Sequence, residues 1–257
     1  MKVTVTEMDD GAAKFESDWE RLAKHVRKND SELVLLPEMP FHPWVCSKPK
    51  FDPAIWKKVV DDHERWMKRL GELGAPMVMG SRPVNRDGKR LNVGFLWDGG
   101  RVSDVHVKGY LPNEGGYWEA TWYQRGDRAF DSFPAHKATA GMMICSDIWA
   151  VQHARTYAKQ GAEIIAVPHA APRVSIPRWV AAGSVVSMVS GTFCIASNRS
   201  GRGGGVEFGG TGGWVISPEG KLLGQTSRAK PFVTVDVDLA EADSAKKTYP
   251  RDALLPD

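Results

Sequence analysis

The sequence has little of what marks secreted, membrane-spanning or disulfide-rich proteins. Its 257 residues include only three cysteines, Cys46, Cys145 and Cys194, which are too scattered for a disulfide framework and fit a reducing compartment. Its apolar runs are far shorter than the roughly 20 residues that a helix needs to cross a bilayer. The first segment, MKVTVTEMDD, soon turns acidic and has no apolar region of the signal-peptide kind. We therefore expect a cytoplasmic protein that does not enter a membrane.

A strong charge imbalance and metal-ligand spacings are absent as well. The chain carries 34 Lys and Arg against 31 Asp and Glu, a net charge of +3, with no basic block that would bind a polyanion. We expect no nucleic-acid partner. Its seven histidines form no His-x-x-x-His pair, and the cysteines form no Cys-x-x-Cys pair. We therefore expect no metal and no cofactor.

Short β-rich segments alternate with amphipathic helical patterns along the chain. Phe15, Trp19, Leu22 and Val26, for example, recur at the spacing of one helix face. This alternation predicts a single α/β domain over 1–257, because no change in composition marks a linker. Strands are expected at 3–7, 33–38, 76–80, 92–97, 101–107, 139–144, 163–170, 192–198, 213–217 and 232–238. Helices are expected around 15–26 and 55–70, before 158 and around 178–190, and a glycine-rich loop at 200–213.

One cysteine stands where a nucleophile would be useful. Cys145 ends an apolar strand and precedes Ser146 and Asp147, at a predicted strand-to-helix turn. Backbone N–H groups and a helix N-terminus at such a turn are expected to lower the pKa of a thiol and can hold an oxyanion. A buried structural cysteine is the alternative. Cys46, in a loop without a motif, and Cys194, inside a strand, are expected to be structural.

Three charged residues are further catalytic candidates, and two of them, like Cys145, lie at the end of a predicted strand. Glu38 directly follows the buried run LVLLP, where burial would raise the pKa of its carboxyl toward that of a general base. Lys108 follows the strand at 101–107 and could stabilise a developing negative charge. Glu119 lies in the aromatic segment GGYWEATWY. A helix-capping or solvated surface role is the alternative for each.

The order of these residues resembles the nitrilase superfamily of carbon–nitrogen hydrolases. The matching segments are LVLLPEMPF around Glu38, VKGYLPNEGGYWEATWYQRGD around Lys108 and Glu119, GMMICSDIW around Cys145, and ASNRSG at 196–201. The resemblance covers nearly the whole chain. It implies an α-β-β-α four-layer sandwich that pairs as a homodimer or a higher homo-oligomer.

The resemblance also implies roles for the site residues. Cys145 would attack an amide, carbamoyl or nitrile carbon, and Glu38 would take the thiol proton and later activate water. Lys108 and the backbone N–H of Ser146 would stabilise the oxyanion, while Glu119 would orient Lys108 or the leaving group. A thioester intermediate and release of ammonia or an amine follow. Candidate substrate-binding residues beside these motifs are Trp44, Tyr117, Trp118, Ser146, Trp149 and His169.

The chain departs from the superfamily pattern in two places. Ala150-Val151-Gln152 replaces a usual Phe-Pro-Glu, and Val186-Ser187-Met188-Val189-Ser190 replaces a usual Arg-Ala-x-Glu-Asn. Two acids and an arginine are missing together, which suggests that a buried charge cluster has been exchanged for apolar and neutral groups.

A third departure bears on the substrate. Similar carbamoyl-amino-acid hydrolases carry arginines that grip a carboxylate where this chain has Ile148 and Trp149. These positions predict a neutral amide substrate, unless Arg173 or Arg178 supplies the missing cation.

Other functions remain open at this stage. Ser146-Asp147 after the cysteine is more typical of amidases and carbamoylases than of nitrilases acting on nitriles, which remain the nearest alternative. A papain-like pair of Cys145 with a histidine such as His169 is a second alternative. A silent binding protein with the same fold is a third.

Overall fold

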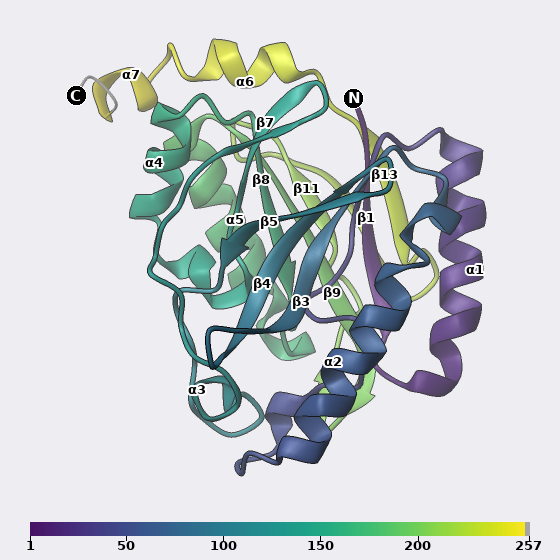
Figure 1. The fold of residues 1–257 in the computed structure, drawn as a ribbon. Helices are drawn as coiled ribbons and strands as arrows, with labels where there is room; N and C mark the ends of the chain where they lie inside the picture. The colour runs from purple at the N-terminus through teal and green to yellow at the C-terminus, as the bar shows by residue number, and fades with distance from the viewer. Residues whose placement is uncertain (255–257) are drawn as a thin grey trace.

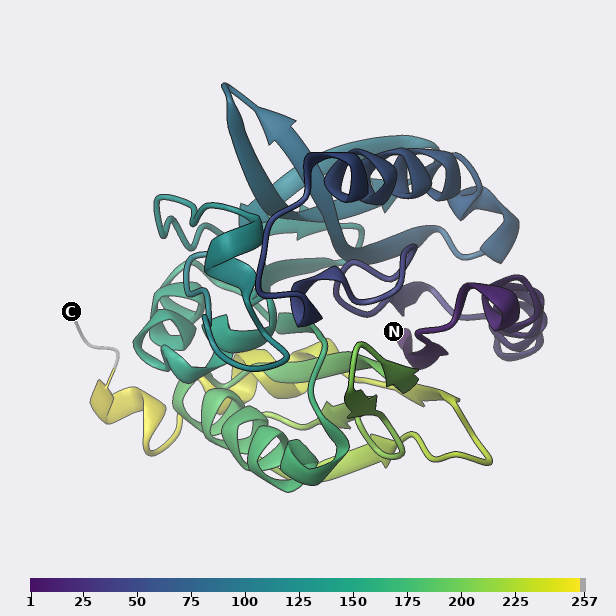
Figure 2. The same ribbon diagram turned by 90° about the horizontal axis from the view of Figure 1, so that it is seen from below.

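The computed structural model describes residues 1–254, in which two facing layers of strands lie between outer helices (Figures 1 and 2). The strands are β1 (Lys2–Asp9), β2 (Leu33–Leu35), β3 (Met77–Arg86), β4 (Lys89–Asp98), β5 (Arg101–Val107), β6 (Phe133–Ala135), β7 (Ala138–Met142), β8 (Ile164–His169), β9 (Phe193–Gly203), β10 (Val206–Phe208), β11 (Trp214–Ile216), β12 (Leu222–Gln225) and β13 (Phe232–Asp236). The α-helices are α1 (Ala12–Asn29), α2 (Pro53–Met67), α3 (Glu119–Trp122), α4 (Gln152–Lys159), α5 (Ile176–Ser190), α6 (Leu239–Ala245) and α7 (Arg251–Leu254).

Strand β1 joins the two layers. Along its first part it pairs in parallel with β2, Val3 opposite Leu33, and antiparallel with β13. Its last residues pair instead with β9, Glu7 opposite Asn198. The first layer therefore contains β13, β1, β2, β3, β4 and β5, and the second contains β9, β8, β7 and β6, with β11 beside β9 and β12 beside β11.

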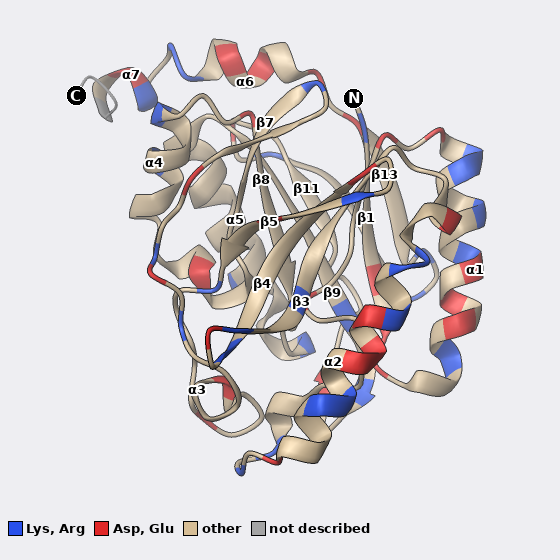
Figure 3. Ribbon diagram, viewed as in Figure 1, with Lys and Arg blue, Asp and Glu red and all other residues tan. Residues whose placement is uncertain are grey.

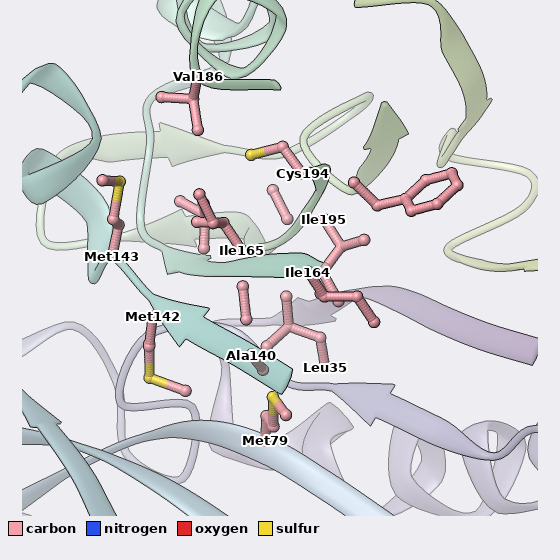
Figure 4. Packing of buried hydrophobic residues seen from close by; sticks show 14 of the residues in the cluster. Leu35, Met79, Ala140, Met142, Met143, Ile164, Ile165, Val186, Cys194 and Ile195 are labelled. Atoms are coloured by element: carbon pink, nitrogen blue, oxygen red, sulfur yellow. The ribbon is translucent and has the colours of Figure 1, made fainter. Parts of the chain in front are cut away.

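The main core lies between the two layers. Leu35 and Met79 of the first layer pack in one cluster with Ala140 and Met142 of the second (Figure 4). Residues of the opposite parity face outward, as the two-residue period of a strand requires. Val34, for example, packs in a separate cluster with aromatic residues of α1 and α2. The α-β-β-α sandwich implied by the sequence is confirmed.

The helices lie on the two outer sides, with α1 and α2 over the first layer and α4 and α5 over the second (Figure 2). Charged residues of both signs gather along α1 and α2 (Figure 3). Within residues 1–254, no helix is long and apolar enough to span a membrane.

The elements expected from the sequence are present, with differences at their ends. Much of the glycine-rich segment 200–213 is not a loop, because β9 extends to Gly203 and turns back into β10. Gly204 and Gly205 make this turn with positive φ angles of 56° and 86°, which explains the glycines. The short elements β6, β10, β12, α3, α6 and α7 were not predicted, since none has a strong apolar period.

Gly141 permits close contact between β7 and α4. A Cβ atom at this position would lie 2.6 Å from the buried ring of Tyr157, whose hydroxyl donates to the Met142 carbonyl at 2.6 Å. We expect Gly141→Ala to lower the free energy of unfolding by about 1–3 kcal/mol, because the ring has no room to retreat. Gly115→Ala, where a Cβ meets nothing within 4 Å, is the matched control. Urea unfolding measures both, and equal stability of the two variants would contradict this packing.

Candidate active site

Four chemically active residues meet where the two layers join. Glu38 follows β2 and Lys108 follows β5, both in the first layer, whereas Cys145 follows β7 in the second. Glu119 begins the short helix α3. All four are buried, and ligand atoms of Glu38, Glu119 and Cys145 lie within 4.8 Å of one another. The structure thus brings together the four catalytic candidates of the sequence.

Lys108 lies at the centre of this group. Its Nζ donates to Glu38 Oε1 at 2.7 Å and to Glu119 Oε2 at 2.5 Å. Burial opposes its positive charge, but Cys145, Glu119 and Glu38 outweigh burial and hold the pKa of Lys108 well above its ordinary value. Lys108 is therefore an ammonium ion at neutral pH.

Glu38 keeps one carboxylate oxygen free. Oε1 accepts hydrogen bonds from Lys108 and from Asn92 Nδ2, the latter at 2.8 Å. Oε2 is buried and has no hydrogen-bond partner in the described part of the chain. A carboxylate held by one oxygen presents the other as a proton acceptor, and the Cys145 thiol is the nearby acidic group.

Cys145 occupies a strained turn. Its φ angle is +50°, in the left-handed region, and it begins the 3₁₀ helix η3 (Cys145–Trp149) rather than an α-helix. Burial, with Glu38, raises the pKa of its thiol well above the ordinary value, although Lys108 and the Ala170 N–H oppose this. The expectation that the turn lowers this pKa is wrong, because η3 is short and the thiol is buried. The resting group is a thiol that needs a base.

Glu119 is held on the far side of Lys108. Its Oε2 also accepts a hydrogen bond of 2.5 Å from the hydroxyl of Tyr123. Burial raises the pKa of Glu119 to about 8, even though Lys108 favours the carboxylate. Glu119 can therefore hold a proton near neutral pH.

Glu38, Glu119 and Cys145 also form a group whose ligand atoms are close enough for a metal ion. Lys108, however, donates to both carboxylates and supplies the positive charge there. The donor set therefore fits an ammonium-centred site better than a metal centre.

Asp147 ties the two catalytic loops together. Its Oδ1 accepts from the N–H groups of Gly109 and Tyr110, at 3.1 and 2.9 Å, directly after Lys108. Its Oδ2 accepts from the N–H of Ile144 at 3.1 Å, directly before Cys145, and contacts His106. The sequence showed Asp147 beside the cysteine but not this role.

Arg199 holds the segment that carries Glu38. Its Nε donates to the Glu38 carbonyl at 3.1 Å, and its terminal nitrogens donate to the carbonyls of Met39 and His42 and to Asp10. It is 2% exposed. Neither Arg199 nor Asn92 was predicted, since no local pattern distinguishes them.

A cavity of about 350 Å³ opens beside Cys145. Of the expected substrate-binding residues, Tyr117, Ser146 and Trp149 line it, and the buried hydroxyl of Tyr117 has no partner in the described chain. The other lining residues are Pro112, Glu114, Ala170, Pro172, Ser175, Arg178 and Trp179.

Trp44, Trp118 and His169 do not line this cavity. The two tryptophans belong to a cluster that also contains the lining residue Tyr117, and Trp44 Nε1 donates to the Gly116 carbonyl. His169 Nε2 contacts the Gly212 carbonyl at 2.8 Å, and burial lowers the pKa of its imidazole to about 4. His169 is thus a neutral core residue, and the group around Cys145 does not include it.

The departures on α5 have a simple structural consequence. Val186 and Ser190 are fully buried, Val189 is partly buried, and the Ser190 hydroxyl donates to the Val186 carbonyl at 2.6 Å. Gln152 is exposed at the start of α4. The three positions on α5 therefore hold neutral side chains that pack inside the protein, whereas Gln152 lies at the surface.

Comparisons with known proteins find similarity over most of the chain. Residues 3–247 match the family described as carbon–nitrogen hydrolase. The chain is 27% identical over 177 residues to a citrullinase of Francisella tularensis, covering 66% of this chain and 61% of the relative. It is 27% identical over 154 residues to an N-carbamoylputrescine amidase of Oryza sativa, covering 59% and 51%. The matches thus span about half to three fifths of these relatives.

The fold is similar to that of solved structures. A carbon–nitrogen hydrolase from Helicobacter pylori superposes with a TM-score of 0.87 at 20% identity, covering 98% of this chain and 94% of that one. At this identity the likeness concerns the fold.

The raised pKa of Glu119 makes stability depend on pH. The folded protein retains a proton up to about pH 8 that the unfolded chain releases near its ordinary pKa of 4.5. The contribution of Glu119 to the free energy of unfolding therefore falls as pH rises between these values. Glu119→Gln should remove this fall, so that the wild type loses stability relative to the variant across that range.

Chemical unfolding at a series of pH values measures the difference. Glu64→Gln, at an exposed position of α2, is the control and should leave the pH dependence unchanged. Parallel curves for the wild type and Glu119→Gln would show that Glu119 has an ordinary pKa.

Proposed function

The chain belongs to the carbon–nitrogen hydrolase family, and from that membership we propose that it hydrolyses an amide or N-carbamoyl group of a small molecule through a thioester at Cys145. One observation carries the proposal. The free Oε2 of Glu38 lies in the same buried group as a thiol that burial keeps protonated. A base beside an otherwise inert nucleophile is the arrangement that covalent catalysis needs.

The first half of the reaction forms the covalent bond. Glu38 Oε2 takes the thiol proton as the sulfur of Cys145 attacks the carbonyl carbon, and the carbonyl oxygen becomes an oxyanion. The Lys108 ammonium and the N–H of Ser146 stabilise this oxyanion in a site from which water is largely excluded. The C–N bond then breaks, and the leaving nitrogen takes the proton from Glu38 and departs as ammonia or an amine.

The second half releases the acyl group. Water loses a proton to Glu38 and attacks the thioester, which gives a second oxyanion at the same donors. When the C–S bond breaks, the sulfur regains the proton that Glu38 holds. Glu119, which binds Lys108 at 2.5 Å, keeps the ammonium oriented through both halves.

The choice of substrate class rests on the relatives and the cavity. The relatives named citrullinase and N-carbamoylputrescine amidase favour a carbamoyl substrate. A cavity of about 350 Å³ is of the size that holds small molecules rather than polymers. Nitrile hydrolysis is an outcome that the substrate panel below would detect.

A homodimer is part of the proposal. Val185 and Met188 of α5 are 41% and 37% exposed, and apolar side chains exposed on one helix favour contact with another subunit. Light scattering after gel filtration should give twice the chain mass, and Val185→Glu/Met188→Glu should reduce it. A monomeric wild type at micromolar concentration would contradict the pairing.

Removing the nucleophile should abolish turnover. We expect Cys145→Ala to lose at least about three orders of magnitude in kcat, because no other group can form the thioester. Ammonia release from a panel of amides, carbamoyl compounds and nitriles measures this, and rapid-quench mass spectrometry should detect the acyl group on Cys145. Cys194→Ala, in the buried strand β9, is the matched control and should remain active. Full activity of Cys145→Ala would refute the mechanism.

The shape of the Lys108 side chain should matter as much as its charge. Lys108→Arg keeps the positive charge, but the planar guanidinium is too large for a fully buried site between the carboxyl groups of Glu38 and Glu119. We expect kcat to fall at least about 100-fold while the protein remains folded by circular dichroism. Near wild-type turnover in this variant would show that Lys108 does not stabilise the oxyanion.

A further inference from the structure

The cavity beside Cys145 carries one cationic and one anionic side chain among its lining residues. Arg178 lies in the first turn of α5, and Glu114 lies in the loop between β5 and α3. Much of the remaining wall is apolar, with Pro112, Trp149 and Trp179 among its members. Charged groups on an otherwise apolar wall select the ligand, since they bind only a partner of opposite charge.

Neither charge is used by the protein itself. Across residues 1–254, the side chains of Arg178 and Glu114 make no hydrogen bond and no ion pair, although they line one cavity. By contrast, Arg173, five positions earlier and before the start of α5, pairs with Glu207 at 3.1 Å and does not line this cavity. Arg178 is therefore the cation that remains available to a bound molecule.

The surroundings of Arg178 favour an anion. Arg178 is the third residue of α5, where the helix dipole adds positive potential. Its guanidinium can bind a carboxylate through two parallel hydrogen bonds. Ile148, where a carboxylate-binding arginine was considered from the sequence, is fully buried and does not line the cavity. Arg178 can supply the cation that this position lacks.

We infer that Arg178 and Glu114 bind the carboxylate and the ammonium of a zwitterionic group, so that the preferred substrate is a small carbamoyl or amide compound with an α-amino acid group distant from the bond that breaks. This inference rests on the proposed function, because it places the scissile carbonyl at Cys145. Arg178 binds the carboxylate, Glu114 binds the ammonium, and the apolar wall contacts the methylene chain between them and the carbonyl. A neutral substrate, as expected from Ile148 and Trp149, then has a lower kcat/KM than the zwitterion.

A matched set of four substrates tests the inference. All carry the same terminal ureido group on the same methylene chain, and the far end bears both the carboxylate and the amine, the amine alone, the carboxylate alone, or neither. The wild type should have the highest kcat/KM for the zwitterion. Arg178→Gln should lower kcat/KM about 10- to 100-fold for the two carboxylate-bearing compounds and leave the other two within about twofold. Glu114→Gln should do the same for the two amine-bearing compounds.

The controls separate this inference from the proposed function. Arg173→Gln removes a nearby arginine that does not line the cavity, and it should not change the order of the four substrates. Circular dichroism and the melting temperature should be unchanged in all three variants, since these side chains are exposed. If the wild type hydrolyses all four compounds with kcat/KM values within about twofold, the proposed function stands and the zwitterion inference is refuted. If it hydrolyses none of them and no primary amide of the same length, the proposed function is refuted, and the inference falls with it.

Discussion

The buried ammonium of Lys108, held between the carboxyl groups of Glu38 and Glu119, is the interaction on which the rest of this structure depends. Taking three ionisable groups out of water is costly, and only close pairing with good hydrogen bonds offsets that cost. The distances of 2.7 and 2.5 Å from Lys108 to Glu38 and Glu119 satisfy this requirement. Because Lys108 binds one oxygen of Glu38 and leaves the other free, the same interaction also creates the base that the thiol needs.

The contacts of Lys108 and Cys145 require the two layers of strands to pack against each other. Glu38 and Lys108 come from one layer of strands and Cys145 from the other, so the site forms only when the layers pack face to face. Close packing sets how near they come. At Gly94 of β4, for instance, a Cβ atom would collide with Met142 of β7. Asp147 then bonds across the junction, from the N–H groups after Lys108 to the N–H before Cys145.

The residues that carry out the reaction are different from the charged residues that select the substrate. The reacting groups are buried and held by residues such as Asn92, Tyr123 and Arg199, which fix their positions within the protein. The charged side chains of the cavity wall, Arg178 and Glu114, by contrast, make no hydrogen bond or ion pair within the described part of the chain. A wall of this kind can change its charges without disturbing the reacting groups, because it is not part of the network around Lys108.

The sequence by itself determined the periodic elements and the order of the reacting residues. Apolar spacing predicted α1, α2, α5 and most strands, because burial on one face imposes a repeat that is visible locally. The order of Glu38, Lys108, Glu119 and Cys145 was readable as a resemblance to a family. Only the tertiary structure decided that the thiol is protonated, that Arg199 and Asp147 hold the catalytic loops, and that Tyr117 rather than Trp44 or His169 lines the cavity. These properties depend on contacts between segments as many as 189 positions apart. No local pattern encodes such contacts, because burial and partner choice arise only when the layers close on each other.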